Sequence, residues 1–226
     1  RELPPAIRAL AREPRLLVLT KANSRATVHR PGYLDYVGVK RFDAAGRVTG
    51  ERRFVGLYTS AAYHADPGEI PLIRRKVARI LDRAGFPAAS HGYKNLRALL
   101  HAYPRDELFQ VDEATLFETA MGVLRLGDRR RTRLFLRRDL YGRFFSCLIY
   151  LPRESFNTDV RLRIQEILRR RLSGTSVEYT VQLTDAVLAR IHMLVRTHPR
   201  DEPVVDATAL EEEVARATRR WEDDLK

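Results

Sequence analysis

The stretch that decides the fold of this chain reads Arg129-Arg-Arg-Thr-Arg-Leu-Phe-Leu-Arg-Arg-Asp-Leu-Tyr-Gly-Arg-Phe-Phe-Ser-Cys-Leu-Ile-Tyr-Leu-Pro-Arg153. It predicts two β-strands, at about 132–138 and 143–151, joined by a tight turn at Asp139 to Gly142. The first strand alternates leucine with arginine or phenylalanine, so it buries one side. The second strand is apolar on both faces. We therefore expect it at the centre of a sheet, with part of its second face covered by another domain or subunit.

Helical and extended patterns flank this hairpin. Helices are predicted at 112–126, where Asp112 is the N-cap, and at 158–172, where Gly174 closes the helix. Two further strands are predicted at 177–183 and 188–197. The order α-β-β-α-β-β is typical of an α+β fold, a ferredoxin-like or ACT-like antiparallel sheet with two helices on one face. We expect the last strand to fill the slot that the first strand normally takes.

The C-terminal residues predict a helix whose single apolar stripe needs a partner surface. The stripe consists of Leu210, Val214, Ala217, Trp221 and Leu225.

The region before residue 104 predicts a second set of elements. After a short N-terminal helix or linker come a brief strand at Leu16 to Leu19 and a hairpin. The hairpin has arms at 36–42 and 47–59, and Gly46 supplies the positive φ that its turn needs. A helix over 70–81 ends at Gly85-Phe-Pro87, and a shorter helix follows and ends at Pro104. Its inward residues are Leu96, Leu99 and Leu100.

Composition limits the class of protein. The chain has 226 residues, 44% of them hydrophobic, and a net charge of +12. This charge indicates either a polyanion partner or an arginine-rich surface that acidic parts of a larger protein balance. The lone Cys147, in an apolar run, predicts a buried thiol and a reducing, cytoplasmic location. No run approaches the about 18 apolar residues of a membrane span, so no membrane partner is expected. The first residue is Arg1 rather than Met, which indicates that the chain begins within a longer protein.

Motifs for catalysis, metals or cofactors are not found in the sequence. The histidines His29, His64, His91, His101, His192 and His198 show no zinc-type spacing, which predicts no metal site. Ser24 and Ser60 lack the context of a nucleophile elbow. No Gly-x-Gly-x-x-Gly or Walker motif occurs, so we assign no catalytic and no cofactor-binding residue. In Tyr58 to Tyr63 the hydroxyls are expected to satisfy backbone groups rather than bind a ligand, and any ligand-binding residues stay unknown.

Arginines gather on the central hairpin and at the end of the helix that follows it. They are Arg129, Arg130, Arg131, Arg133, Arg137, Arg138, Arg143 and Arg169 to Arg171. One interpretation is a nucleic-acid-binding surface, because Gly142-Arg-Phe-Phe145 is similar to the aromatic strand of an RNA-recognition module. The other is a charge-guarded edge strand, a cationic helix end or salt bridges. The second is favoured, since stacking aromatics on one face would alternate whereas Phe144 and Phe145 are adjacent.

Four motifs resemble the large bacterial NAD-specific glutamate dehydrogenases, and together the resemblance covers nearly the whole chain. They are Leu19-Thr-Lys-Ala-Asn-Ser-Arg-Ala-Thr-Val-His-Arg-Pro-Gly-Tyr-Leu-Asp-Tyr36, Arg53-Phe-Val-Gly-Leu-Tyr-Thr-Ser-Ala-Ala-Tyr63, Ile70-Pro-Leu-Ile-Arg-Arg-Lys76 and Tyr103-Pro-Arg-Asp-Glu-Leu-Phe109. The hairpin of 129–153 looks like part of the same family's long N-terminal half.

The resemblance implies a modular, non-catalytic segment. Residues 1–14 would be a linker, 15–103 a PAS-like module, 104–200 an ACT-like module and 201–226 the start of a helical linker. The family oxidatively deaminates glutamate to 2-oxoglutarate and ammonia with NAD, and its catalytic lysine and aspartate lie far downstream. We therefore expect a regulatory or scaffolding role, with other domains and subunits of a homo-oligomer as partners and an amino acid as effector. The alternative is a nucleic-acid-binding module that uses the basic hairpin from Arg129 to Arg143.

Overall fold

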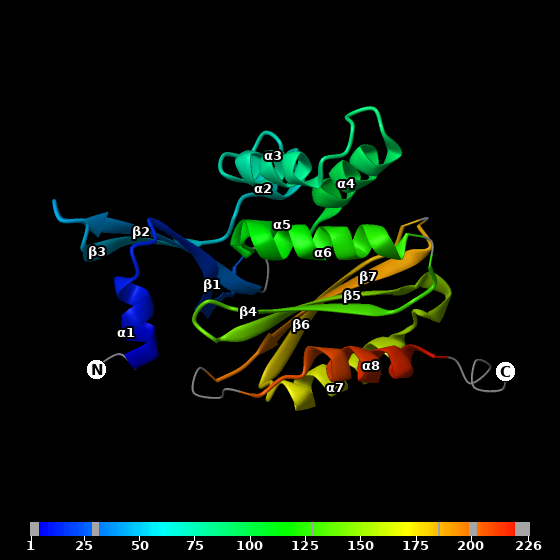
Figure 1. The fold of residues 1–226 in the computed structure, drawn as a ribbon. Coiled ribbons are helices and arrows are strands. Elements are labelled where there is room, and N and C mark those ends of the chain that lie inside the picture. The colour runs from blue at the N-terminus through cyan, green and yellow to red at the C-terminus, as the bar shows by residue number, and fades with distance from the viewer. Residues whose placement is uncertain (1–4, 29–31, 128, 185, 199–202, 220–226) are drawn as a thin grey trace. The chain divides into compact units, whose positions relative to one another are not determined.

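The computed structural model (Figure 1) describes residues 5–28, 32–127, 129–184, 186–198 and 203–219. The chain forms two compact units, residues 1–117 and 118–226. Each unit contains one antiparallel sheet with helices, so the predicted α+β class is confirmed. In the described part of the chain, no helix is both long enough and apolar enough to cross a membrane.

The first unit is built on a three-stranded sheet in the order β1-β2-β3. The strands are β1 (Leu17–Ala26), β2 (Gly32–Phe42) and β3 (Val48–Gly56). The predicted hairpin is confirmed: Gly46 has φ 75°, and Asp43 Oδ1 accepts the backbone N–H groups of Ala45 and Arg47. The strand predicted at Leu16 to Leu19 is too short. It continues through Lys21, a charged residue that the sequence pattern did not mark as buried.

Among the described residues, five helices lie entirely within the first unit. They are α1 (Pro5–Arg12), α2 (Ser60–His64), α3 (Ile73–Ala84), α4 (His91–Ala102) and α5 (Arg105–Gln110). The predicted end of α3 is confirmed, because Gly85 follows it in the left-handed conformation. Ser90 Oγ accepts the Tyr93 N–H and caps α4. Lys40 of β2 reaches the end of α1, where its Nζ donates to the carbonyl oxygens of Leu10 at 2.7 Å and Glu13 at 2.8 Å.

Helix α6 (Glu113–Leu126) runs from the first unit into the second. The predicted N-cap is confirmed: Asp112 Oδ1 accepts the Thr115 N–H at 2.9 Å. Leu116 and Ala120 are buried, as the helical spacing predicts.

The second unit contains a four-stranded sheet in the order β4-β5-β7-β6. The strands are β4 (Arg133–Arg138), β5 (Phe144–Pro152), β6 (Ser176–Gln182) and β7 (Leu188–Arg196). All nine residues of β5 are buried, which confirms that it is central. The last strand, β7, lies between β5 and β6. This is the interior slot that the first strand takes in a ferredoxin-like sheet, as predicted.

Helices cover both faces of this second sheet (Figure 1). The helices α7 (Thr158–Arg171) and α8 (Ala207–Thr218) share one face, and a 3₁₀ turn (Arg153–Ser155) follows β5. The prediction that the helices at 112–126 and 158–172 lie on one face is wrong, because α6 lies on the other. Successive side chains of β4 point to opposite faces of the sheet. Leu134 packs in the core with α7 and α8, whereas the next residue, Phe135, faces Gly122 of α6.

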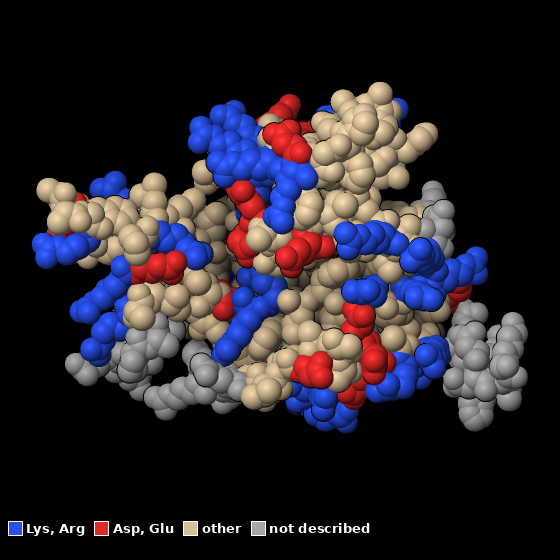
Figure 2. Space-filling view, viewed as in Figure 1, with Lys and Arg blue, Asp and Glu red and all other residues tan. Residues whose placement is uncertain are grey.

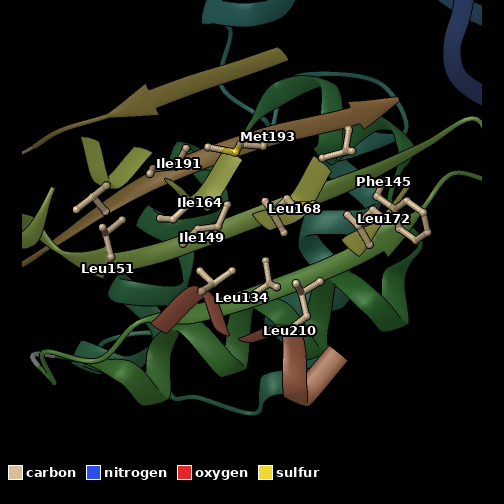
Figure 3. Packing of buried hydrophobic residues seen from close by; sticks show 14 of the residues in the cluster. Leu134, Phe145, Ile149, Leu151, Ile164, Leu168, Leu172, Ile191, Met193 and Leu210 are labelled. Carbon is tan, nitrogen blue, oxygen red and sulfur yellow. The ribbon is translucent and has the colours of Figure 1, made fainter. Parts of the chain in front are cut away.

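The core of the second unit lies between the sheet and the pair α7 and α8. Figure 3 shows this packing, and the labelled residues are Leu134, Phe145, Ile149, Leu151, Ile164, Leu168, Leu172, Ile191, Met193 and Leu210. Leu210 and Val214 of α8 are buried in it and Ala217 packs against it, so the partner surface that the C-terminal stripe needed is this core. Trp221 and Leu225 of the predicted stripe lie outside the described residues.

Helix α7 does not end at the glycine that the sequence predicted. The left-handed residue is Ser173, with φ 54°, rather than Gly174. The Gly174 N–H donates to the Arg169 carbonyl at 2.7 Å and the Ser173 N–H to that of Arg170 at 3.4 Å, a Schellman motif. Glycine is needed at 174 for another reason: a Cβ there would lie 2.5 Å from Cγ1 of Val195.

Candidate functional site: a buried lysine–aspartate cluster

A buried lysine lies between two carboxylates in the first unit. The Lys21 Nζ on β1 is 2.6 Å from Asp35 Oδ1 on β2 and 3.0 Å from Asp106 Oδ2 on α5. Lys21 is 5% exposed and Asp35 4%. Charged residues are almost never buried to this extent unless they are paired. These three residues are called the lysine cluster below.

Two tyrosines extend the lysine cluster. The Tyr58 backbone N–H donates to Asp35 Oδ2 at 3.0 Å, and the Tyr63 hydroxyl donates to Asp106 Oδ1 at 2.5 Å. The expectation that the hydroxyls of Tyr58 to Tyr63 satisfy backbone groups is therefore wrong for Tyr63, whose partner is a carboxylate. The Tyr58 ring stacks on Phe109 of α5, with 4.5 Å between ring centroids.

Burial controls the acid–base behaviour of the lysine cluster. Burial raises the pKa of Asp35, while the Lys21 ammonium opposes the shift. Burial also raises the pKa of the Tyr58 hydroxyl, and the charges of Asp35 and then Asp106 add to that shift. The arrangement holds an ammonium among acceptors inside the protein. This chemistry suits the lysine cluster to hold β1, β2 and α5 together rather than to react with a substrate.

A second lysine binds the C-terminal end of α5. The Nζ of Lys76, on α3, donates to the carbonyl oxygens of Leu108 at 2.8 Å, Phe109 at 3.4 Å and Val111 at 2.5 Å. These are carbonyl groups at the C-terminus of α5, where a cation is favourable.

Arg105, at the start of α5, is also buried. Its Nη2 donates to the Ala65 carbonyl at 3.0 Å, whereas Nε and Nη1 have no hydrogen-bond partner among the described residues. Burial lowers the pKa of Arg105, and the charge of Asp66 opposes the shift.

Sequence reasoning missed the lysine cluster, although a signal was present. The four motifs that carry the family resemblance supply the lysine cluster, its two tyrosines and Lys76. Lys21 and Asp35 come from the first, Tyr58 and Tyr63 from the second, Lys76 from the third and Asp106 from the fourth. Segments far apart in the sequence thus meet around α5.

The arginines singled out from the sequence are largely paired with carboxylates inside the second unit. The pairs are Arg130–Glu154 at 3.0 Å, Arg133–Glu211 at 2.9 Å, Arg143–Asp139 at 3.2 Å, Arg169–Glu166 at 2.7 Å, Arg170–Glu213 at 2.7 Å and Arg171–Glu213 at 3.4 Å. Figure 2 shows acidic side chains among the basic ones on the visible face. The salt-bridge interpretation of these arginines is therefore the better supported.

The second face of the β5 strand is buried, as its two-sided apolar pattern predicted. Phe144, Leu148 and Tyr150 are buried on this face. We expected another domain or subunit to cover this face. At Phe135 of the neighbouring strand β4, helix α6 covers it instead, because a Cβ at Gly122 of α6 would lie 2.7 Å from the Phe135 ring. Burial raises the pKa of the Tyr150 hydroxyl, and Arg190 opposes the shift.

Two polar residues lie among these apolar ones. Ser146 Oγ and His192 Nε2 are 2.9 Å apart, and both residues are buried. Cys147, on the opposite face of the same strand, is buried too, as predicted.

Comparison with known proteins now adds to this geometry. Residues 133–222 match the family model for the glutamate dehydrogenase ACT2 domain, and residues 70–129 match that for glutamate dehydrogenase helical motif 1. The NAD-specific glutamate dehydrogenase of Halomonas elongata is 42% identical over 212 residues, which is 94% of this chain and 13% of that protein. The Pseudomonas aeruginosa enzyme of the same name is 44% identical over 216 residues, 96% of this chain and 13% of that protein. The Mycobacterium tuberculosis one is 33% identical over 228 residues, 96% of this chain and 14% of that protein.

The chain belongs to the NAD-specific glutamate dehydrogenase family. It spans 13% of the length of the first two relatives. The glutamate dehydrogenase ACT2 match covers the four-stranded sheet with α7 and α8, so the ACT-like fold is confirmed. The helical motif 1 match covers α3 to α6 and so includes Lys76 and Asp106. The PAS-like assignment of residues 15–103 and the predicted module boundaries stay predictions.

These relatives are named for NAD, which is a dinucleotide. Dinucleotides bind at the carboxyl ends of parallel strands, beside a glycine-rich turn that opens a helix. Both described sheets are antiparallel, so these residues do not fit a dinucleotide. Within the residues that the structure describes, no group of three or more His, Cys, Asp or Glu is placed to hold a metal ion.

Proposed function

We propose that this chain is a non-catalytic regulatory and scaffolding segment of a cytoplasmic, homo-oligomeric, NAD-dependent glutamate dehydrogenase. The parent reaction is the oxidative deamination of L-glutamate to 2-oxoglutarate and ammonia. The match of the four-stranded unit to a glutamate dehydrogenase ACT2 domain carries this proposal. The lysine cluster supports it, because its carboxylates are committed to a buried ammonium and hold a fold together.

Regulation requires a ligand that distinguishes two states of the enzyme. An amino acid that binds one packing of these units better than another shifts the population towards that packing. The coupling is reciprocal, so substrate binding at the catalytic domain then changes the affinity for the amino acid by the same factor.

A thermal-shift screen tests the proposal on the 226-residue chain. The ligands are L-amino acids, their D-enantiomers as matched controls, NAD and adenine nucleotides. We expect one L-amino acid to raise the unfolding temperature with the logarithm of its concentration above Kd, with about 2.7 kcal/mol of stabilisation at 100 times Kd. Equal effects of both enantiomers, or stabilisation by NAD alone, would contradict an amino-acid sensor.

The nucleic-acid alternative is an outcome of the same screen. If a short RNA stabilises the chain at low salt and the effect collapses at about 0.2 M salt, the arginine hairpin becomes the functional surface. Three of the hairpin's arginines, Arg130, Arg133 and Arg143, already have carboxylate partners among the described residues, which argues against this alternative.

A further inference from the structure

Arg105 of α5 is a buried cation whose hydrogen bonds the first unit does not satisfy. The residue is 8% exposed. Its Nη2 donates to the Ala65 carbonyl at 3.0 Å, while Nε and Nη1 have no partner among the described residues. Arginine is almost never buried to this extent unless it is paired. Because each unpaired buried donor lowers stability, the position of Arg105 needs a reason other than the stability of the fold.

The guanidinium of Arg105 keeps one complete pair of donors. Its N–H groups form two planar forks, one made by Nε with Nη2 and one by Nη1 with Nη2. The Ala65 carbonyl takes one hydrogen of Nη2. Whichever hydrogen that is, both donors of the other fork remain. A fork of this kind matches the two oxygens of a carboxylate.

A carboxylate of the same unit lies within electrostatic reach of Arg105 but does not fill this fork. The charge of Asp66 opposes the effect of burial on the Arg105 pKa. The two side chains nevertheless form no ion pair in the part of the chain that the structure describes. Asp66 Oδ1 accepts the Gly68 N–H at 2.7 Å, and Oδ2 lies 3.9 Å from His101 Nε2, which is too long for a hydrogen bond. A donor fork and an acceptor oxygen are therefore close to one another without meeting.

We propose that Arg105 and Asp66 bind the two charged groups of a free amino acid, its α-carboxylate at the Arg105 fork and its α-ammonium at Asp66 Oδ2. This inference deepens the proposed function and rests on it, because it assigns the amino-acid effector to residues of the first unit. An amino acid carries one group of each sign on the same carbon atom, so it satisfies both residues at once. A simple anion satisfies Arg105 alone.

Solvent reaches the acidic side of this pair. The Asp66 side chain is 42% exposed and that of His101 57%. The Arg105 nitrogens lie below the surface, so an amino acid reaches them when the segment 65–68, between α2 and α3, moves outward. The closed and open arrangements of this segment differ in affinity for the amino acid, and such a difference is what a regulatory ligand requires.

Calorimetric titration of the 226-residue chain tests the site. The probes are the standard L-amino acids, inorganic phosphate, and two analogues of any amino acid that binds: its amide, which lacks the carboxylate, and its 2-oxo acid, which lacks the ammonium. The variants are Arg105→Gln, Arg105→Lys and Asp66→Asn. Arg97→Gln is the matched control, because Arg97 is an exposed arginine of α4 in the same unit.

We expect an L-amino acid to bind more tightly than either of its analogues. Arg105→Gln should weaken its Kd by about 30-fold or more, because it removes one partner of a buried charge pair. Arg105→Lys should also weaken binding, since an ammonium does not reproduce the fork. Asp66→Asn should weaken binding of the amino acid but not of its 2-oxo acid, and Arg97→Gln should change neither. Without ligand, Arg105→Gln should not lower the unfolding temperature, because it removes a buried charge with unpaired donors.

Three results would overturn the proposal. An amino acid that binds Arg105→Gln as tightly as the unsubstituted chain would overturn this site alone and leave the proposed sensing function standing. Binding of phosphate as tight as that of the amino acid, and lost in Arg105→Gln, would show an anion site that does not recognise amino acids. Failure of every amino acid to bind the unsubstituted chain would overturn both this site and the proposed sensing function.

Discussion

Replacing Lys21 with methionine would isolate the electrostatic role of the lysine cluster. The substitution keeps most of the side-chain volume but leaves Asp35, 4% exposed, without its counter-charge at 2.6 Å. Breaking a buried ion pair in this way costs about 3–5 kcal/mol. We expect a loss of that size at pH 7 in urea unfolding, with hydrogen exchange of the β1 and β2 amides reporting on the first unit separately.

The pH dependence of this loss has a definite sign. The pKa of Asp35 in the folded protein is already above its ordinary value of 3.8, so the stability linked to its protonation is present at low pH and is lost as pH rises through the folded pKa. Removing the Lys21 ammonium raises that pKa further. The variant should therefore lose up to about 1.4 kcal/mol per pH unit relative to wild type as pH rises from about 4 towards 7. At pH 4 the two proteins should differ least.

Lys40→Met is the matched control. Lys40 is also buried, but its Nζ donates to the carbonyl oxygens of Leu10 and Glu13 rather than to carboxylates. Its removal leaves no buried charge, so we expect a loss of about 1–3 kcal/mol that does not change between pH 4 and 7. Adding Asp35→Asn to Lys21→Met should restore part of the stability. A Lys21→Met loss that is the same at pH 4 and pH 7, or a double variant with no recovery, would refute the reasoning.

Two further predictions concern the second unit. Leu168→Ala in its core should lower the unfolding free energy by about 2–5 kcal/mol. Leu162→Ala on the same helix, where the side chain is 47% exposed, should change it by no more than about 0.5 kcal/mol. Equal losses in denaturant unfolding would contradict the placement of α7. Ser173→Gly should stabilise by about 0.5–1 kcal/mol because it relieves the left-handed strain at φ 54°. Gly174→Ala should instead destabilise by about 1–3 kcal/mol, as a Cβ there would meet Val195, and thermal unfolding of both variants would show opposite shifts.

Local patterns were enough to predict most elements of the fold. Asp112 marks the start of α6 because its carboxylate satisfies a free N–H of the first turn, and that chemistry needs no tertiary partner. The two-sided apolar run of 144–151 predicted a central strand because only such a strand is buried on both faces. The face that each helix covers was not predictable in the same way. Leu134 and Phe135 are both apolar, and only the packing shows that α7 and α8 meet one while α6 meets the other.

The candidate site depends on contacts that sequence patterns do not encode. Lys21, Asp35 and Asp106 look like ordinary surface charges in three separate segments, and periodicity assigns charged residues to solvent. Only the folded chain brings both carboxylates within 3.0 Å of the Lys21 ammonium. Lys21 and Asp35 lie in the first family motif and Asp106 in the fourth, which marked these segments without identifying their partners. Strand β1 was predicted too short for the same reason, because its middle is buried through ion pairing rather than through apolar side chains.

The sequence by itself determined most of the elements, the centre of the second sheet and the family, since these follow from local hydrogen bonding, side-chain periodicity and motif identity. The tertiary structure alone decided which charges are buried together, which helix covers which face and which sheet edge is closed. Those features depend on long-range contacts whose free energy exists only when distant segments meet. Glu211 illustrates the difference: in the sequence it is one of three consecutive glutamates of a helix, and in the fold it accepts the backbone N–H of Leu134 at the β4 edge.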